Sequence, residues 1–170
     1  YMINYAVIGT SMITGKFIES AQATNKWDLT TIYSRTAEKA ENFIDSEALK
    51  DITIETDWNA FLNSTHFSTV YIASPNSIHF QQAIALLKAK KNVVVEKPIF
   101  PTAAELKEAQ RIAKENNVFI FEAARHIHEA NFKIVKELVA NTPNIEGATF
   151  AYSKYSSRYD QVLNGEQPNI

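Results

Sequence analysis

The stretch Tyr5-Ala-Val-Ile-Gly9-Thr-Ser11-Met-Ile-Thr14 decides the expected fold of this chain. Its pattern indicates an apolar strand that runs into a tight turn and then into a helix. In doubly wound α/β folds a dinucleotide's pyrophosphate lies at such a turn, because the turn and the helix start present unpaired backbone N–H groups to the phosphates. The usual glycine fingerprint is only partly kept, with Gly9, Ser11 and Thr14 in its three positions. This match is weak by itself, so the interpretation depends on the segments around it.

The segment Tyr33-Ser34-Arg35 lies about 24 residues downstream of Gly9, where a second strand should end. An Asp or Glu at this strand end would bind the ribose 2′-hydroxyl of NAD, but the chain has Ser34 and Arg35 there, with Lys39 one helical turn later. A cation and a hydroxyl suit a 2′-phosphate, so the sequence predicts NADP as the cofactor in preference to NAD. The alternative is that Arg35 and Lys39 are ordinary solvated charges at the start of a helix.

Strand and helix patterns alternate along residues 2–123, with short connections between them. Apolar, β-rich segments predict strands at 3–8, 29–33, 52–54, 69–73, 93–95 and 118–121. Helical patterns separate them, including segments at 36–44, 57–62, 77–87 and 102–115. This order predicts an α/β fold, a Rossmann-type doubly wound parallel sheet with helices on both faces.

Residues 124–170 have a different pattern. Apolar residues from Ile127 to Val139 recur at the period of an amphipathic helix, and residues 148–155 alternate enough to predict one strand. Residues 156–170 are expected to be loop.

Composition excludes several kinds of site and partner. The formal net charge of the 170 residues is −2 and no basic tract occurs, so neither nucleic acid nor an anionic membrane is an expected partner. Without cysteine there are no disulfides, thiolate metal sites or cysteine nucleophiles, and the four histidines lack metal-binding spacing, so no metal is expected. No apolar run approaches the roughly 18 residues that cross a bilayer. Absence of cysteine and of an export signal favours the cytoplasm.

A third motif, Glu96-Lys97-Pro98, directly follows the β-branched strand 93–95. Ligands of open α/β sheets bind at the carboxyl ends of the strands. Lys97 can there present a cation to a substrate hydroxyl or carbonyl and help to move a proton while hydride passes to or from a nicotinamide, with Glu96 orienting it. Pro98 fixes the exit of the chain and can be cis. The alternative, a charged strand end followed by a turn, is favoured unless a wider pattern supports the motif.

Such a wider pattern exists, because the chain resembles the Gfo/Idh/MocA-type oxidoreductases, typified by glucose–fructose oxidoreductase and inositol dehydrogenase. The resemblance rests on residues 7–11, on Tyr71-Ile-Ala-Ser-Pro-Asn76-Ser-Ile-His79 and on Glu96-Lys97-Pro98, and it extends from residue 2 to about residue 155. It implies that Lys97 and Glu96 are catalytic. The chain departs from many members after Glu122-Ala123, where Arg125, His126, Ile127 and His128 stand.

The residues predicted to bind the cofactor combine the motifs and the resemblance. They are Gly9, Thr10, Ser11, Met12, Ile13, Ser34, Arg35, Lys39, Ala73, Ser74, Pro75, Asn76, His79, Glu96, Lys97 and Arg125. For Asn76 the alternative is a plain helix cap, and for His79 it is a packing or surface role.

The resemblance implies a dinucleotide-binding domain over residues 2–123 and, over 124–170, the truncated start of an α+β substrate and dimerisation domain. The implied function is an NADP-dependent oxidoreductase that transfers hydride between NADP(H) and a sugar- or polyol-like hydroxyl or carbonyl, as a homo-oligomer when full length. The chain of 170 residues should then bind the cofactor without catalysing. Two alternatives are a dinucleotide-sensing regulator without turnover and a generic nucleotide-binding domain. Lys97 favours the enzyme, since a sensor has no need of it.

Overall fold

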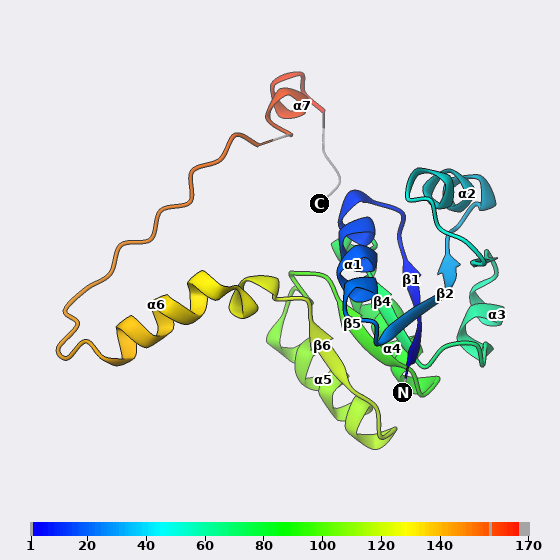
Figure 1. Ribbon diagram of the computed structural model, residues 1–170, viewed down its shortest axis with the longest axis horizontal. Helices are drawn as coiled ribbons and strands as arrows, with labels where there is room; N and C mark the ends of the chain where they lie inside the picture. Colours follow the sequence, from blue (N-terminus) through cyan, green and yellow to red (C-terminus); the bar gives the residue numbers. More distant parts are fainter. Residues whose placement is uncertain (1, 157, 167–170) are drawn as a thin grey trace. The chain divides into compact units, whose positions relative to one another are not determined.

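A six-stranded parallel sheet forms the centre of the fold (Figure 1). It belongs to a computed structural model that describes residues 2–156 and 158–166. The chain divides into two compact units, Tyr1–Ala123 and Ala124–Ile170, and the first contains the sheet. The strands are β1 (Ile3–Ile8), β2 (Trp27–Tyr33), β3 (Thr53–Glu55), β4 (Thr69–Ile72), β5 (Asn92–Val95) and β6 (Ile120–Glu122).

The strand order is β3-β2-β1-β4-β5-β6, and every neighbouring pair is parallel. The order reverses between β1 and β4, and ligands of open α/β sheets bind outside the carboxyl ends of the strands at such a switch point. The predicted doubly wound sheet is therefore confirmed. Its topology brings the carboxyl ends of β1, β2, β4 and β5, which carry the three sequence motifs and the segment 73–79, to one edge.

The side chains of each strand alternate in direction, so the sheet has an apolar cluster on both faces. Helices cover each of these faces. They are α1 (Met12–Ala23), α2 (Ala37–Ser46), α3 (Trp58–Asn63), α4 (His79–Lys88) and α5 (Ala103–Glu115), with the 3₁₀ turn η1 (Asn76–Ile78) before α4. Within β1, Val7 packs against α1 and α2, whereas Ala6 and Ile8 pack against α3, α4 and α5. Two apolar clusters, one on each face, thus hold the sheet.

Local sequence explains where several helices begin. Asp57 caps α3 by accepting a hydrogen bond of 2.7 Å from the backbone N–H of Ala60. Thr102 and Glu105 form a reciprocal capping box at the start of α5. Thr36 stands at the N-cap position of α2 but makes no side-chain capping bond.

Pairing with neighbours, more than composition, sets the strand limits. The third strand is Thr53–Glu55 instead of 52–54, because these residues pair with residues 31–33 of β2. The sixth is Ile120–Glu122 instead of 118–121, in register with Val93 to Val95. The element types were predicted correctly in both places, but their ends were shifted.

The second unit contains the 3₁₀ turn η2 (Arg125–His128) and the helices α6 (Ala130–Ala140) and α7 (Tyr159–Leu163). The predicted amphipathic helix is confirmed as α6. The strand predicted at 148–155 was wrong, because these residues have no neighbouring strand within the part of the chain that the structure describes. The loop predicted over 156–170 was wrong where α7 forms; positions 157 and 167–170 lie outside the described residues.

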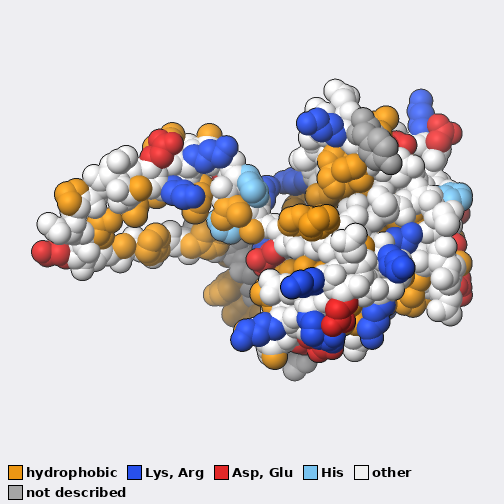
Figure 2. Space-filling view, turned by 90° about the horizontal axis from the view of Figure 1, so that it is seen from below, with side chains coloured by type: hydrophobic (Ala, Val, Ile, Leu, Met, Phe, Trp, Pro, Cys, Tyr) orange, Lys and Arg blue, Asp and Glu red, His pale blue; other side chains and the backbone are white. Residues whose placement is uncertain are grey.

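Apolar side chains of this second unit are widely exposed (Figure 2). Phe150 is 93% exposed and Tyr152 is 90% exposed, in the segment that alternates like a strand but has no sheet partner among the described residues. Ile134 and Leu138 of α6 are also exposed. The segment 148–155 and α6 thus have apolar side chains that no other described residues cover.

Candidate functional site

The turn between β1 and α1 is shaped by a glycine that no other residue can replace without strain. Gly9 has a φ of +103°, and a Cβ added to it would lie 2.6 Å from the carbonyl oxygen of Ala73, at the end of β4. The absence of a side chain lets the turn after β1 lie directly against the end of β4. In a dinucleotide fingerprint the first glycine is required for a tight turn at this place.

The start of α1 next to this turn has free hydrogen-bond donors. Ser11 is the N-cap residue, and its backbone carbonyl accepts from the N–H groups of Thr14 and Gly15 at 2.9 and 3.2 Å. The N–H groups of Met12 and Ile13 come too early in the helix to have an intrahelical acceptor. The Ser11 hydroxyl makes no capping bond either. These donors suit an anionic group bound at the N-terminus of the helix.

The end of β2 presents two cations without a competing carboxylate partner. Arg35 and Lys39 are exposed, and neither forms an ion pair within residues 2–156 and 158–166. Ser34 is buried, with its backbone N–H bonded to the carbonyl of Glu55 at 3.1 Å. The Glu55 carboxylate accepts from the N–H groups of Thr56 and Asp57, so its Oε1 is held by its own loop. Arg35 and Lys39 are therefore available to a phosphate, although Glu38 lies in the same first turn of α2.

The segment after β4 lies beside the Gly9 turn. The N–H of Ala73 donates to the carbonyl of Ile8 at 2.9 Å, and the Ser74 hydroxyl donates to Oε1 of Gln82 at 2.6 Å. Pro75 occupies the N-cap position of η1, without a side-chain bond, and Asn76 is the first residue of that turn. Asn76 is thus not the helix cap that the alternative interpretation required.

His79 is fully buried and joins two strand ends. Its Nε2 lies 2.8 Å from the carbonyl oxygen of Ser74, and its Nδ1 lies 3.2 Å from that of Pro98. Both ring nitrogens face backbone carbonyl oxygens, and a neutral ring donates its single N–H to one of them. The buried ring links the β4 and β5 loops, which agrees with the packing alternative, and the predicted contact of His79 with the cofactor stays a prediction.

The turn Glu96-Lys97-Pro98 follows β5, and its Lys97–Pro98 peptide bond is cis. Lys97 has an exposed side chain that makes no ion pair with any described residue. Glu96 contacts the backbone N–H of Lys97, which donates to its Oε2 at 3.1 Å, and not the ammonium group. Glu96 can therefore orient Lys97 through the main chain.

Two residues that the sequence motifs do not assign to the site hold this turn. The hydroxyl of Tyr71, in β4, donates to Oε1 of Glu96 at 2.7 Å. Glu122, at the end of β6, accepts the backbone N–H of Ile99 at 3.0 Å. No local signal in the sequence indicates either contact, because the partners come from different strands.

Burial controls the protonation of Tyr71. Loss of hydration raises its pKa far above the ordinary value, and the hydrogen bond to Glu96 and the charge of that carboxylate raise the pKa further. The phenol therefore stays protonated at neutral pH and remains a donor to Glu96.

Arg125 belongs to the second unit, where it opens η2. Its Nε lies 3.5 Å from Oε1 of Glu129, and both side chains are largely exposed. This ion pair is local to the second unit, so the predicted contact of Arg125 with the cofactor stays a prediction.

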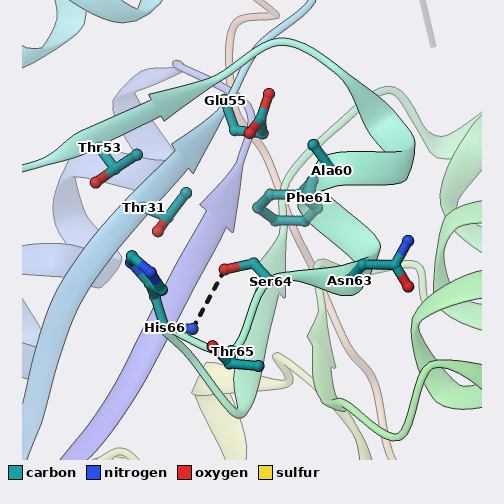
Figure 3. A pocket seen from close by; sticks show the side chains of 9 residues that line it. All are labelled: Thr31, Thr53, Glu55, Ala60, Phe61, Asn63, Ser64, Thr65 and His66. Carbon is teal, nitrogen blue, oxygen red and sulfur yellow. Dashed lines mark hydrogen bonds between the residues drawn. The ribbon is translucent and has the colours of Figure 1, made fainter.

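Other features of the surface do not coincide with the predicted site. A hollow of about 310 Å³ lies beside β2, β3 and α3, with Thr31, Thr53, Phe61 and His66 among its lining residues (Figure 3). None of the predicted site residues lines it. Among the described residues no three His, Asp or Glu side chains form a group that could hold a metal ion. No described helix has both the length and the apolar character needed to cross a membrane.

Relatives in sequence cover nearly the whole chain. The uncharacterized oxidoreductase YgjR of Escherichia coli K12 is 39% identical over 168 residues, which are 99% of this chain and 51% of YgjR. The scyllo-inositol 2-dehydrogenase (NADP(+)) IolU of Bacillus subtilis 168 is 37% identical over 174 residues, covering 99% of this chain and 52% of IolU. The chain thus spans about half the length of these relatives.

Solved structures share the fold. The 3-ketoreductase KijD10 of Actinomadura kijaniata, in complex with NADP and TDP-benzene, has a TM-score of 0.75 and 21% identity, over 82% of this chain and 42% of KijD10. An NAD-binding protein from Listeria innocua has a TM-score of 0.74 and 26% identity, over 82% of this chain and 40% of its own. Residues 3–124 match the Gfo/Idh/MocA family model, described as an oxidoreductase family with an NAD-binding Rossmann fold. The chain therefore belongs to the Gfo/Idh/MocA oxidoreductase family, as its strand-end motifs predict.

Proposed function

We propose that this chain is the cofactor-binding half of an NADP-dependent oxidoreductase that transfers hydride between NADP(H) and a sugar- or polyol-like hydroxyl or carbonyl. The observation that carries the proposal is the set of groups at the carboxyl ends of the parallel strands: the Gly9 turn, the exposed cation of Arg35 and the exposed ammonium of Lys97. IolU, which is named a scyllo-inositol 2-dehydrogenase (NADP(+)), supports both the cofactor and the substrate class.

The residues divide by the part of the cofactor that they suit. Thr10, Ser11, Met12 and Ile13 offer the donors of the turn and the helix start to the pyrophosphate. Ser34, Arg35 and Lys39 suit the 2′-phosphate, and the segment 73–76 follows the ribose and nicotinamide side. In this proposal His79 binds the cofactor together with that segment, and Glu96 and Lys97 lie toward the reacting groups. Arg125 stays a predicted cofactor contact.

Lys97 is proposed to do the proton chemistry. The bound nicotinamide supplies or accepts the hydride, which is chemistry that no side chain provides. When a carbonyl is reduced, the ammonium of Lys97 donates a proton to the oxygen that becomes the hydroxyl, which leaves a neutral amine at Nζ. When a substrate hydroxyl is oxidised, the neutral amine form of Lys97 accepts the hydroxyl proton and becomes the ammonium. Glu96 keeps the main chain of Lys97 in place through its bond to the Lys97 N–H.

The two units also receive proposed roles. Residues 2–123 form the dinucleotide domain, and residues 124–170 begin the substrate and dimerisation domain of a protein about twice this length, since the chain spans 51% and 52% of its relatives. A small-molecule substrate, a homo-oligomeric full-length protein and a cytoplasmic location complete the proposal. The lack of cysteine agrees with a reducing compartment.

Arg35 tests the cofactor preference. A charge-assisted bond to phosphate contributes about 1.5–3 kcal/mol, so Arg35→Ala should weaken NADPH binding about tenfold or more and leave NADH nearly unchanged. Fluorescence titration of both cofactors measures this difference. Arg111→Ala is the matched control, because Arg111 is an exposed arginine that pairs with Glu115 on α5. Equal losses for NADPH and NADH would contradict the assignment of the 2′-phosphate site.

Lys97 tests the reaction itself. In the full-length protein, Lys97→Ala should lower kcat strongly and change the NADPH dissociation constant little, because the ammonium interacts mainly with charge that develops during hydride transfer. The assay uses NADP⁺ with a polyol panel that includes scyllo-inositol, and NADPH with the corresponding ketones. Tight NADPH binding without turnover of any compound by the unmodified protein would favour the dinucleotide-sensing regulator instead.

A further inference from the structure

A buried tyrosine is bonded to the carboxylate of the proposed catalytic turn. Tyr71 is 1% exposed, and its hydroxyl donates to Oε1 of Glu96 at 2.7 Å. The other carboxylate oxygen of Glu96, Oε2, accepts the backbone N–H of Lys97 at 3.1 Å. A carboxylate with a donor on each oxygen has one preferred orientation, because rotation would break both bonds.

The ring of Tyr71 is itself fixed from behind. It stacks on Phe17 of α1, with ring centroids 3.8 Å apart and an interplanar angle of 5°. It also belongs to the buried cluster that contains Val7 of β1 and Ile32 of β2. Since side chains in a packed core occupy few rotamers, the hydroxyl has little freedom to leave Glu96.

The same contacts connect the two ends of the proposed cofactor site. Phe17 lies in α1, whose first turn carries the donors for the pyrophosphate, and Glu96 lies in the turn that carries Lys97. The side chain of Tyr71 contacts both of these elements, one through the ring stack and the other through the hydrogen bond.

We propose that Tyr71 is a positioning residue for the hydride-transfer reaction: its hydroxyl fixes Glu96, which fixes the main chain at Lys97. The inference rests on the proposed function. The proposal adds to the site a buried residue that acts through Glu96 without contact to the substrate. In this proposal α1 supports the catalytic turn through the ring of Tyr71.

Tyr71→Phe removes the hydroxyl and keeps the ring that stacks on Phe17. The first readout is amide hydrogen exchange at Lys97, measured by NMR on the 170-residue chain or the full-length protein. We expect exchange about tenfold faster, as for loss of a bond to a charged acceptor. Tyr33→Phe is the matched control, since Tyr33 packs on Trp58 and Phe61 at the end of β2 and is not part of this chain of contacts. Unchanged exchange at Lys97 would overturn the proposal.

The second readout separates positioning from general support of the fold. In the full-length protein, with NADP⁺ and scyllo-inositol or the panel polyol turned over fastest, Tyr71→Phe should lower kcat about tenfold and leave the KM for NADP⁺ within about twofold. Faster exchange with an unchanged kcat would reduce Tyr71 to a structural residue and overturn the proposal. If the unmodified protein turned over no compound, the proposed function would fail, and the exchange result would still decide whether Tyr71 holds the turn.

Discussion

Replacing Gly9 by alanine should destabilise the first unit strongly, and the structure gives two separate reasons. The backbone at Gly9 has a φ of +103°, a conformation that costs an L-residue about 1–2 kcal/mol. The new Cβ would also lie 2.6 Å from the carbonyl oxygen of Ala73, which is backbone and cannot swing away. Forcing an atom into such a packed position costs about 1–3 kcal/mol.

Together these effects predict that Gly9→Ala lowers the free energy of unfolding by about 3 kcal/mol. This corresponds to a urea midpoint lowered by about 1.5 M, when the free energy of unfolding falls by about 2 kcal/mol per M of urea. The relief of strain would move the turn after β1 away from the end of β4. NADPH binding should therefore weaken as well, measured without urea at a temperature where both proteins are folded. Circular dichroism during urea unfolding gives the stability change, and cofactor fluorescence gives the affinity.

Gly15→Ala provides the control within the same unit. Its added Cβ would meet the carboxylate end of Glu47 at 2.5 Å, but this side chain is exposed and can turn away. Alanine also favours a helix over glycine by about 1 kcal/mol. Gly15→Ala should thus be neutral or slightly stabilising. A loss below about 1 kcal/mol for Gly9→Ala, or an equal loss for both variants, would refute this account of the turn.

Three further changes test the packing and capping of the first unit. His79→Phe keeps a buried ring but removes both ring nitrogens, so the carbonyl that accepts the ring N–H loses its donor. The free energy of unfolding in urea should fall by about 2 kcal/mol, and an unchanged midpoint would contradict the link. Tyr5 has a buried hydroxyl without a partner among the described residues, so Tyr5→Phe should be neutral or stabilising by up to about 1 kcal/mol. Burial raises the pKa of Tyr5, so above pH 10 the unfolded chain releases a proton that the folded protein keeps. The free energy of unfolding therefore falls as pH rises. In Tyr5→Phe the unfolding midpoint should decline less between pH 9 and 11. Thr102→Ala removes the capping box of α5 and should cost about 1 kcal/mol by thermal unfolding, whereas an unchanged Tm would show that the cap contributes little.

Local patterns in the sequence were sufficient to predict the parallel sheet. Alternating strand and helix periods predicted six strands and their order along the chain, and the short motifs at Gly9, Arg35 and Lys97 identified where strands end. These features depend on neighbouring residues, such as the apolar run before Gly9 and the β-branched run before Glu96. The same patterns were sufficient to recognise the family that residues 3–124 match.

Such local patterns could not predict the contacts that support the proposed catalytic turn. Tyr71 and Glu96 are 25 residues apart, Ile99 and Glu122 are 23 apart, and His79 and Pro98 are 19 apart. Each pair meets because parallel strands place their carboxyl ends side by side, and the register of the strands decides which residues face one another. For the same reason the sequence could not show that the ring of His79 is buried between two backbone carbonyls.

The segment 148–155 is a case in which a correct local preference did not produce the predicted strand. Its alternating residues favour an extended conformation, and the sequence alone determines that preference. Whether an extended segment becomes a strand depends on hydrogen bonds to a neighbour, and the described residues provide none. Sequence thus determined the periods, the turn glycine and the chemical groups at the strand ends, because each depends on local geometry. Only the tertiary structure decided the strand limits, the burial of His79 and the bond from Tyr71 to Glu96, because each requires a partner from a distant part of the chain.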